Sequence, residues 1–286
     1  MSFLISVAAL SVVYVVVARL ERTPALRFRT LPSPRPYFTT DLAWYGLAIA
    51  ATAISVFVLR PQLTKLEIAP LPHAIARLPL AAKFLLGLVV FDFVSFVVHV
   101  SLHRSNTLWN VHKVHHSTLH LDGFATTRTH MFENMLRFVP GQAVLFLMGM
   151  SAAIVAPVVA IAAIYGVSNH SNLALNVRWA EVLLVTPRLH RRHHVPSTTQ
   201  HNFGAIFTIW DRCFGTLIQR DTTPDERYGV PDEMDSYPQR FLPAFRNPII
   251  QLRQQRAERR DAGCGHTTSC ARTAPHHSPR GWREKT

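Results

Sequence analysis

Long uncharged apolar stretches dominate the hydrophobic pattern of this chain. Residues 1–18 and 42–59 each run for 18 residues without a charged side chain. A helix of that length is about 27 Å long, close to the roughly 30 Å of a bilayer core. A third apolar stretch, 84–103, contains three ionisable residues. The pattern predicts three membrane-spanning helices. A signal peptide is the alternative for the first, but the stretch lacks a basic start and a small-residue cleavage site before Arg19.

A fourth apolar stretch is too long for one membrane crossing and short for two. It covers 32 residues, 138–169, without a charge, and Pro140 and Pro157 are the expected bends. We therefore predict a tight helical hairpin. The fold class that follows is an all-α integral-membrane helical bundle with about four transmembrane helices, or three plus a re-entrant hairpin.

The formal charge of +13 is concentrated late in the chain, because 17 of the 30 Lys and Arg residues follow His170. The positive-inside rule then predicts a cytoplasmic C-terminus. The basic segment 249–261 suits a helix on an anionic membrane surface and equally a solvated helix. No nucleic-acid-binding module is recognisable, so we expect no nucleic-acid partner. The three cysteines have no spacing typical of a disulfide framework or a zinc ribbon.

The histidines are clustered, and eleven of the sixteen lie between His99 and His194. Within the clusters they recur at spacings of three and four residues, which place side chains on one face of a helix. A single pair of this kind is more often packed or hydrogen-bonded than metal-bound, but three clusters together favour ligation. The clusters are His99 with His103, then His112, His115 and His116, and finally His190, His193 and His194.

Metal binding explains these clusters physically. Imidazoles buried beside a bilayer lose hydration and would repel one another as cations, whereas a metal holds them neutral. Asp92 lies seven residues before His99, on the same stripe, and is expected to accept a hydrogen bond from a ligand imidazole. The ligands of one site must meet on one side of the membrane, so 138–169 must cross an even number of times or re-enter. This predicts a cytosolic, helical, histidine-rich cap, with His170 beside the other ligands.

At these motifs the sequence resembles the fatty acid hydroxylase superfamily, which includes the sterol desaturases, over roughly residues 80–216. One departure is Met131, where family members often have proline after the preceding histidine. The resemblance rests on residues 99–103, 109–117, 170–172, 190–194, 202–204 and 210–216, with Asp92, Arg128, His130 and Glu133.

The resemblance implies that nine histidines coordinate two iron ions, although imidazole also suits zinc. These are His99, His103, His112, His115, His116, His170, His190, His193 and His194. His130 is either a further ligand or a hydrogen-bond donor near the ligands, while His73, His120 and His201 match no ligand position. Carboxylates are expected to support the ligands, with an ordinary cap or ion pair as the alternative for each. The candidates are Asp92, Asp122, Glu133 and Asp211.

The implied activity is a membrane-bound oxygenase that uses dioxygen and external electrons to hydroxylate or desaturate a C–H bond of a lipid. A fatty acyl chain, a sterol or another isoprenoid would reach it from the bilayer. No haem electron-carrier domain is evident, so we expect a separate donor, a ferredoxin or a small haem protein with a reductase. The alternatives are a histidine-rich metal transporter, whose sites usually lie near the bilayer midplane, and a zinc-dependent membrane hydrolase. The pair in 99–103 lacks the glutamate base of a zinc-protease helix.

The chain accordingly divides into four predicted segments. Residues 1–79 are N-terminal transmembrane helices and loops, and 80–220 are a catalytic domain resembling fatty acid hydroxylases. Residues 221–261 are a basic segment that ends in the candidate interfacial helix. The remainder, 262–286, is predicted to be disordered on its polar, Pro- and Gly-containing composition.

Overall fold

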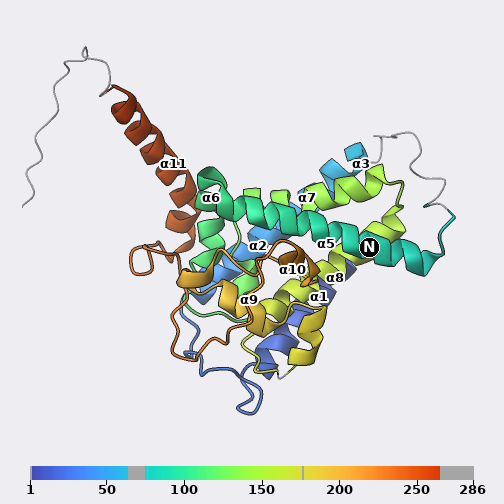
Figure 1. Ribbon diagram of the computed structural model, residues 1–286, viewed down its shortest axis with the longest axis horizontal. Helices are drawn as coiled ribbons and strands as arrows, with labels where there is room; N and C mark the ends of the chain where they lie inside the picture. The colour runs from blue at the N-terminus through green and yellow to red at the C-terminus, as the bar shows by residue number, and fades with distance from the viewer. Residues whose placement is uncertain (1, 64–74, 76, 176, 265–286) are drawn as a thin grey trace, which may run out of the picture. The chain divides into compact units, whose positions relative to one another are not determined.

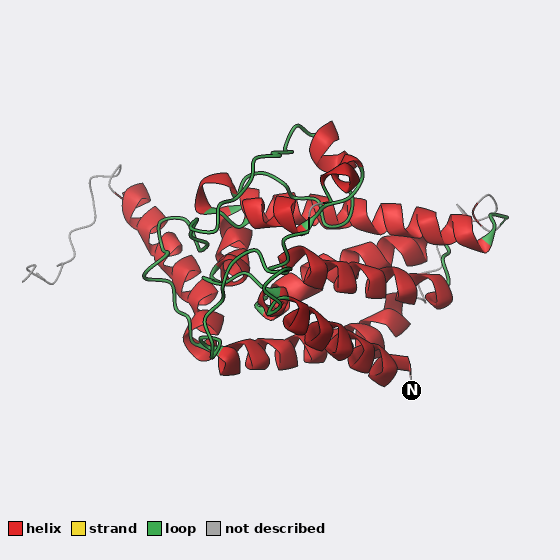
Figure 2. Cartoon of the chain, turned by 90° about the horizontal axis from the view of Figure 1, so that it is seen from below, coloured by secondary structure: helices red, strands yellow, loops and turns green. Residues whose placement is uncertain are grey.

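The computed structural model describes residues 2–63, 75, 77–175 and 177–264. Within these residues the secondary structure is helical, with two isolated β-bridges and no strand, so the predicted all-α fold is confirmed (Figure 2). The principal helices are α1 (Ser2–Leu20), α2 (Phe38–Ile54), α3 (Arg60–Leu63), α5 (Leu80–Arg104), α6 (Asn106–His116), α7 (Met131–Leu147), α8 (Ala152–His170), α9 (Pro187–His193), α10 (Ile209–Cys213) and α11 (Phe241–Cys264). Shorter helical turns are η1 (Ser55–Leu59), η2 (Gly123–Thr127), η3 (Arg178–Val182) and η4 (Pro196–Thr198).

Three helices of the described chain are long and apolar enough to cross a membrane, which makes this a membrane protein. They are Phe38–Val58, Leu80–Arg104 and Ala152–His170. The first two coincide with the predicted stretches 42–59 and 84–103. The apolar part of α1 that the structure describes, Val7–Leu20, falls short of the length of a span.

The predicted hairpin over 138–169 is present, formed by α7 and α8. Its turn lies at 148–151, and Gly149 adopts a positive φ of 76° there, which glycine tolerates without steric cost. Pro140 lies inside α7 and Pro157 inside α8, so neither proline makes the reversal.

The apolar core of the bundle lies where α5, α7 and α8 pack together (Figure 1). Phe91 of α5 is buried against Leu145 of α7 and Val158 of α8. The backbones of α5 and α7 approach closely at Gly141, where an added Cβ would lie only 2.6 Å from a ring carbon of Phe91. This packing fixes the helix that carries the first histidine pair.

A second cluster joins α2, α6 and the first turns of α11. Trp44 of α2 is fully buried, and its ring lies 4.7 Å from that of Phe241. Val114 of α6 and Ala244 of α11 complete the cluster. Burying these side chains holds α6 against α2.

The chain divides into two compact units, Met1–Pro248 and Ile249–Thr286. The first unit contains the helices from α1 to α10 and the start of α11. In the second, α11 continues to Cys264, which is three residues into the segment predicted to be disordered. The other residues of that segment, 265–286, and His73 lie outside the described residues. The predicted domain boundaries stay predictions.

Candidate metal centre

The first five clustered histidines lie on two helices joined by a single residue. His99 and His103 are one turn apart on α5 and are buried. Ser105 follows with extended backbone and caps α6, since its hydroxyl accepts a hydrogen bond from the Leu108 N–H at 3.4 Å. The chain reverses at this point, and the His112 ring lies 4.6 Å from that of His103.

The other four histidines come from α8, α9 and the residue after α9. His170 is the last residue of α8 and His194 is the C-cap of α9. Thr186 caps α9 by accepting from the Leu189 N–H at 3.4 Å, and Pro187 occupies the first turn, where no N–H is needed. These local signals start a short helix whose histidines turn toward α6.

All nine predicted ligands converge, and they form two groups. Within each group one nitrogen from every histidine lies within 4.8 Å of the others, and every member is buried. We call them the five-histidine group and the four-histidine group. The first contains His99, His103, His112, His116 and His193, and the second contains His115, His170, His190 and His194.

Hydrogen bonds to Nδ1 orient several of these rings. His99 Nδ1 bonds to the carbonyl of Phe203 at 2.8 Å, and His193 Nδ1 bonds to the carbonyl of His201 at 2.7 Å. His170 bonds in the same way to its own helix, through the carbonyl four residues earlier, at 2.8 Å. Because a carbonyl only accepts, each Nδ1 carries the proton, and each Nε2 is left with a lone pair that faces the group.

The Nε2 atoms of the four-histidine group lie at the spacing expected of ligands around one ion. His170 Nε2 is 2.9 Å from the Nε2 atoms of both His115 and His190, and His190 Nε2 is 3.2 Å from that of His194. Two nitrogens bound at right angles, each about 2.1 Å from an ion, are about 3 Å apart. Lone pairs so close together repel unless a cation lies between them, so this donor set fits a metal.

The five-histidine group also contains buried nitrogens that indicate a metal site. The Nε2 atoms of His99, His112 and His193 are buried and have no hydrogen-bond partner among the described residues. Within the same part of the chain, His103 and His116 have no partner on either nitrogen. Buried polar atoms without partners are costly, and five that point to one place indicate a ligand site.

Burial keeps the imidazoles outside the spans neutral. It lowers the pKa of His112, His115, His116 and His194 well below the ordinary value, and neighbouring imidazoles lower it further. The pKa of His193 falls to about 4, mainly because of burial. Neutral imidazole is the form that binds a metal.

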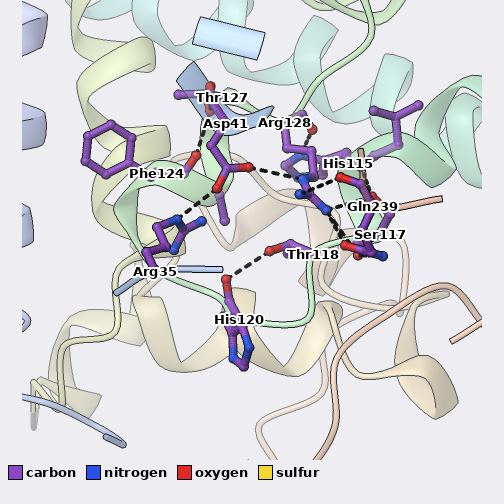
Figure 3. Close-up of polar contacts among 12 residues, drawn as sticks. Arg35, Asp41, His115, Ser117, Thr118, His120, Phe124, Thr127, Arg128 and Gln239 are labelled. Atoms are coloured by element: carbon purple, nitrogen blue, oxygen red, sulfur yellow. Dashed lines mark hydrogen bonds and ion pairs between the residues drawn. The ribbon is translucent and has the colours of Figure 1, made fainter. Parts of the chain in front are cut away.

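A buried polar network ties α2 to this centre (Figure 3). The carbonyl of Arg128 accepts from His115 Nδ1 at 3.3 Å, while its guanidinium donates to Asp41 at 3.2 Å and to the Gln239 side chain at 2.6 Å. Arg35 donates to the other oxygen of Asp41 at 2.8 Å. The first turn of α2 therefore holds the backbone against which His115 is oriented.

The expectation that Asp92 accepts a hydrogen bond from a ligand imidazole is wrong, because the donors to both of its oxygens in the described part of the chain are other groups. One oxygen accepts from the Ile206 N–H at 2.8 Å, and the other accepts from Phe207 N–H at 3.0 Å and Trp210 Nε1–H at 2.8 Å. Its side chain leaves the histidine stripe of α5 and holds the loop 203–208 and the start of α10. That loop supplies the carbonyl that orients the nearest histidine of α5.

Asp211 holds the same loop from its other end. It accepts from the N–H groups of Phe203 and Gly204, each at 2.8 Å, and from the Thr216 hydroxyl at 2.6 Å. It thus acts on His99 through the Phe203 carbonyl. Its support of the centre is indirect.

The other two carboxylates differ from each other. Glu133 accepts from His112 Nδ1 at 2.8 Å, with both side chains fully buried, so it touches a ligand imidazole as expected. Asp122 caps η2 by accepting from the Ala125 N–H at 3.1 Å, and it pairs with Arg35. The ordinary reading of Asp122 as a cap and ion pair is the one the structure supports.

The remaining histidines of this region stand outside both groups. His130 caps α7 by accepting from the Phe132 N–H at 3.3 Å, and its ring stacks on Phe245 at 4.8 Å. His120 is half-buried, and His201 contributes its carbonyl to His193. The carbonyl acceptors were missed by sequence reasoning because main-chain groups carry no residue signature.

Comparison with known proteins agrees with this geometry. The sequence model of the fatty acid hydroxylase family matches residues 84–216, the region that carries all nine histidines. Residues 84–216 of this chain are therefore a fatty acid hydroxylase domain. Its fatty acid hydroxylase domain therefore includes the ligand-bearing ends of α5 and α8 together with α6 and α9.

The curated relatives of this chain are named for several kinds of lipid. It is 32% identical over 141 residues to an ornithine lipid hydroxylase of Rhizobium tropici, covering 49% of this chain and 43% of that protein. It is 29% identical over 124 residues to an alkylglycerol monooxygenase of Danio rerio, covering 42% and 27%. It is 28% identical over 143 residues to sphinganine C4-monooxygenase 2 of Arabidopsis thaliana, covering 49% and 55%. The matches thus span about half or less of these relatives, and no solved structure matches the chain.

Proposed function

We propose that this protein is an integral-membrane, non-haem di-iron oxygenase that hydroxylates or desaturates a C–H bond of a lipid. The observation that carries the proposal is the convergence of nine buried imidazoles into groups of five and four. The names of its relatives, which are hydroxylases and monooxygenases, support the reaction class.

Iron held by the two groups would supply the activation of dioxygen that oxidation of an unactivated C–H bond requires. The chain supplies the ligands, and a carbonyl or a carboxylate on Nδ1 fixes the tautomer that binds. Neutral nitrogen ligands leave the charge of two divalent ions uncompensated. Burial raises the pKa of Glu133, which is bonded to His112 and lies 3.6 Å from Arg137, to about 8, and cations held by the two groups would favour its ionised form.

The placement of the ligands supports a lipid substrate. His99 and His103 lie near one end of a candidate membrane span, and His170 lies at the end of another. A lipid in the adjoining leaflet can therefore bring a carbon to the centre without leaving the bilayer. Fully buried side chains around the histidines, such as Leu102 and Phe203, keep bulk water away.

The excess of Lys and Arg after His170 supports a cytoplasmic position for the centre and the C-terminus. Electrons come from a separate protein, a ferredoxin or a small haem protein with its reductase. The basic helix 249–261 contacts anionic lipid headgroups.

The test is purification under reducing, anaerobic conditions, followed by metal analysis and lipid profiling of cells. Wild-type protein should contain two equivalents of iron, and its expression should produce an oxygenated or desaturated lipid. His193→Ala should abolish that product at unchanged protein level. His120→Ala, which removes a half-buried histidine outside both groups, is the matched control and should retain the product.

Other outcomes distinguish the alternatives. Tightly bound zinc with no change in lipid oxidation would favour the hydrolase. Altered metal uptake by cells with an unchanged lipid profile would favour the transporter. Either result would overturn the proposal.

A further inference from the structure

Two short elements outside the metal centre expose large apolar side chains. They are η3 and α10, each extended by the residue that follows it. The exposed fractions are 79% for Trp179, 74% for Val182, 55% for Leu183, 45% for Ile209 and 61% for Phe214. Isolated exposed apolar residues are common on soluble surfaces, but several that adjoin one another mark an interaction site.

Hydrogen bonds place these two elements side by side. The carbonyl of Leu183 accepts from the Thr208 N–H at 2.9 Å, and the carbonyl of Val182 accepts from the Thr208 hydroxyl at 3.2 Å. Arg212 of α10 donates to the carbonyl of Glu181 in η3 at 2.9 Å. The exposed residues of η3 and α10 therefore form one surface, which we call the η3–α10 surface.

This surface continues onto a membrane-spanning helix. The Trp210 ring lies 4.8 Å from that of Phe93 on α5, and the Phe214 ring stacks at 5.3 Å on Phe96. Phe93 and Val97 are themselves 37% and 45% exposed on α5. The apolar face of a candidate span thus extends into the η3–α10 surface, and Figure 1 shows α10 beside α5.

The η3–α10 surface is attached to α5 and α8 at points that lie on the bilayer side of the metal ligands. Asp92, which bonds to the start of α10, precedes His99 by seven residues, or about 10 Å along α5. The Tyr165 hydroxyl donates to the carbonyl of Val185 at 2.8 Å, and it precedes His170 by five residues, or about 7.5 Å along α8. These distances along the helices match the depth of about 5–10 Å to which interfacial elements bury their apolar face, when the metal ligands are taken to lie at the membrane surface.

We propose that the η3–α10 surface is immersed in the leaflet that adjoins the metal centre. Trp179 lies at the headgroup level, as tryptophan does in interfacial belts, and Val182, Ile209 and Phe214 contact the upper acyl chains. Arg178, beside Trp179 in the sequence, is exposed and pairs with Asp221 at 2.5 Å. Because the η3–α10 surface is continuous with the lipid-facing side of α5, the bilayer is what covers it. The proposal requires that α5 spans the membrane, but it does not depend on iron or on the oxygenase reaction.

Fluorescence quenching in vesicles tests this directly. The full chain is prepared with Cys213, Cys264 and Cys270 replaced by serine, and a single cysteine is introduced as Val182→Cys or Ile209→Cys. Each is labelled with an environment-sensitive fluorophore and reconstituted into phosphatidylcholine–phosphatidylglycerol vesicles. Quenching by acyl-brominated lipid is compared with quenching by aqueous iodide.

Two reference positions calibrate the measurement. Leu85→Cys, on an exposed position of α5, marks the lipid environment, and Asp225→Cys, on an exposed polar loop, marks the aqueous one. Labels at 182 and 209 should be quenched by brominated lipid several-fold more than the label at 225, and should resist iodide as the label at 85 does. If either variant misfolds by circular dichroism, Trp179→Cys and Phe214→Cys report on the same surface.

Iodide quenching at 182 and 209 equal to that at 225 would overturn the proposal. So would shielding from both quenchers that grows with the protein-to-lipid ratio, since that result would identify a contact between two copies of the chain.

Discussion

Replacing Glu133 by glutamine tests whether a carboxylate orients a metal ligand in this protein. The bond from His112 Nδ1 to Glu133 is 2.8 Å long, and both side chains are fully buried. Glu133→Gln keeps the shape and one acceptor oxygen but cannot ionise; burial raises the pKa of Glu133 to about 8, and bound cations would favour its ionised form. Loss of such a partner of a ligand histidine typically weakens metal binding about 10- to 100-fold, or about 1.4 to 2.7 kcal/mol. Because the pair is buried and water cannot replace the charge, we expect the upper half of that range.

The assay is competition for ferrous iron between the protein and a chromogenic chelator under anaerobic conditions. Asp122→Asn is the matched control, since this carboxylate caps η2 and contacts no imidazole. The control should bind iron as the wild type does. An affinity of Glu133→Gln within twofold of wild type would refute the reasoning about His112, whereas failure of all three proteins to bind iron would refute the proposed function.

Three further predictions concern stability. Asp211→Ala leaves buried N–H groups of the 203–204 backbone without an acceptor, so the free energy of unfolding in detergent should fall by about 1–3 kcal/mol per group. Gly141→Ala brings a Cβ within 2.6 Å of the Phe91 ring and should destabilise by about 1–3 kcal/mol. By contrast, Gly46→Ala meets nothing within 4 Å and should leave the melting temperature unchanged or raise it. Burial lowers the pKa of the ligand histidines outside the spans, that of His193 to about 4. The unfolded chain therefore binds more protons below its ordinary histidine pKa of about 6.5, and the metal-free protein should lose stability as pH falls through that value. A melting temperature that is flat between neutral and mildly acidic pH would contradict this last prediction.

The set of candidate ligands could be predicted because helical spacing is a local property. His112 and His116, like His190 and His194, are four residues apart and share a helix face whatever the helix packs against. The division of the histidines into two groups could not be predicted from the sequence. It depends on where α6, α8 and α9 meet, and no spacing within one helix specifies the distance between helices.

Asp92 shows that a shared helix face does not predict which groups a side chain will bond to. Its position relative to His99 was read correctly, but a side chain on a stripe bonds to whatever strong donor lies nearest. Two N–H groups of the loop before α10, those of Ile206 and Phe207, and the ring N–H of Trp210 in α10 donate to Asp92. Those donors are more than a hundred residues away in sequence, and two of them are backbone N–H groups. Long-range contacts to the main chain leave no trace in composition or periodicity.

The way each triplet divides predicts how the two groups respond to loss of a ligand. On α6 the pair four apart joins the five-histidine group, and on α9 it joins the four-histidine group. The remaining member of each triplet is turned about 60° around the helix from one histidine of that pair and about 100° from the other, and it joins the other group. Every triplet therefore contributes ligands to both groups. The groups differ in how many histidines remain when one ligand is lost.

His190→Ala and His103→Ala should consequently differ in metal content. His190 Nε2 is 2.9 Å from that of His170 and 3.2 Å from that of His194, so its loss leaves three nitrogens around an opened position. Loss of His103 leaves four nitrogens in its group. After anaerobic reconstitution and dialysis, the His190→Ala protein should retain about one equivalent of iron and the His103→Ala protein about two. Equal loss from both variants would show that the nine imidazoles act as a single undivided site.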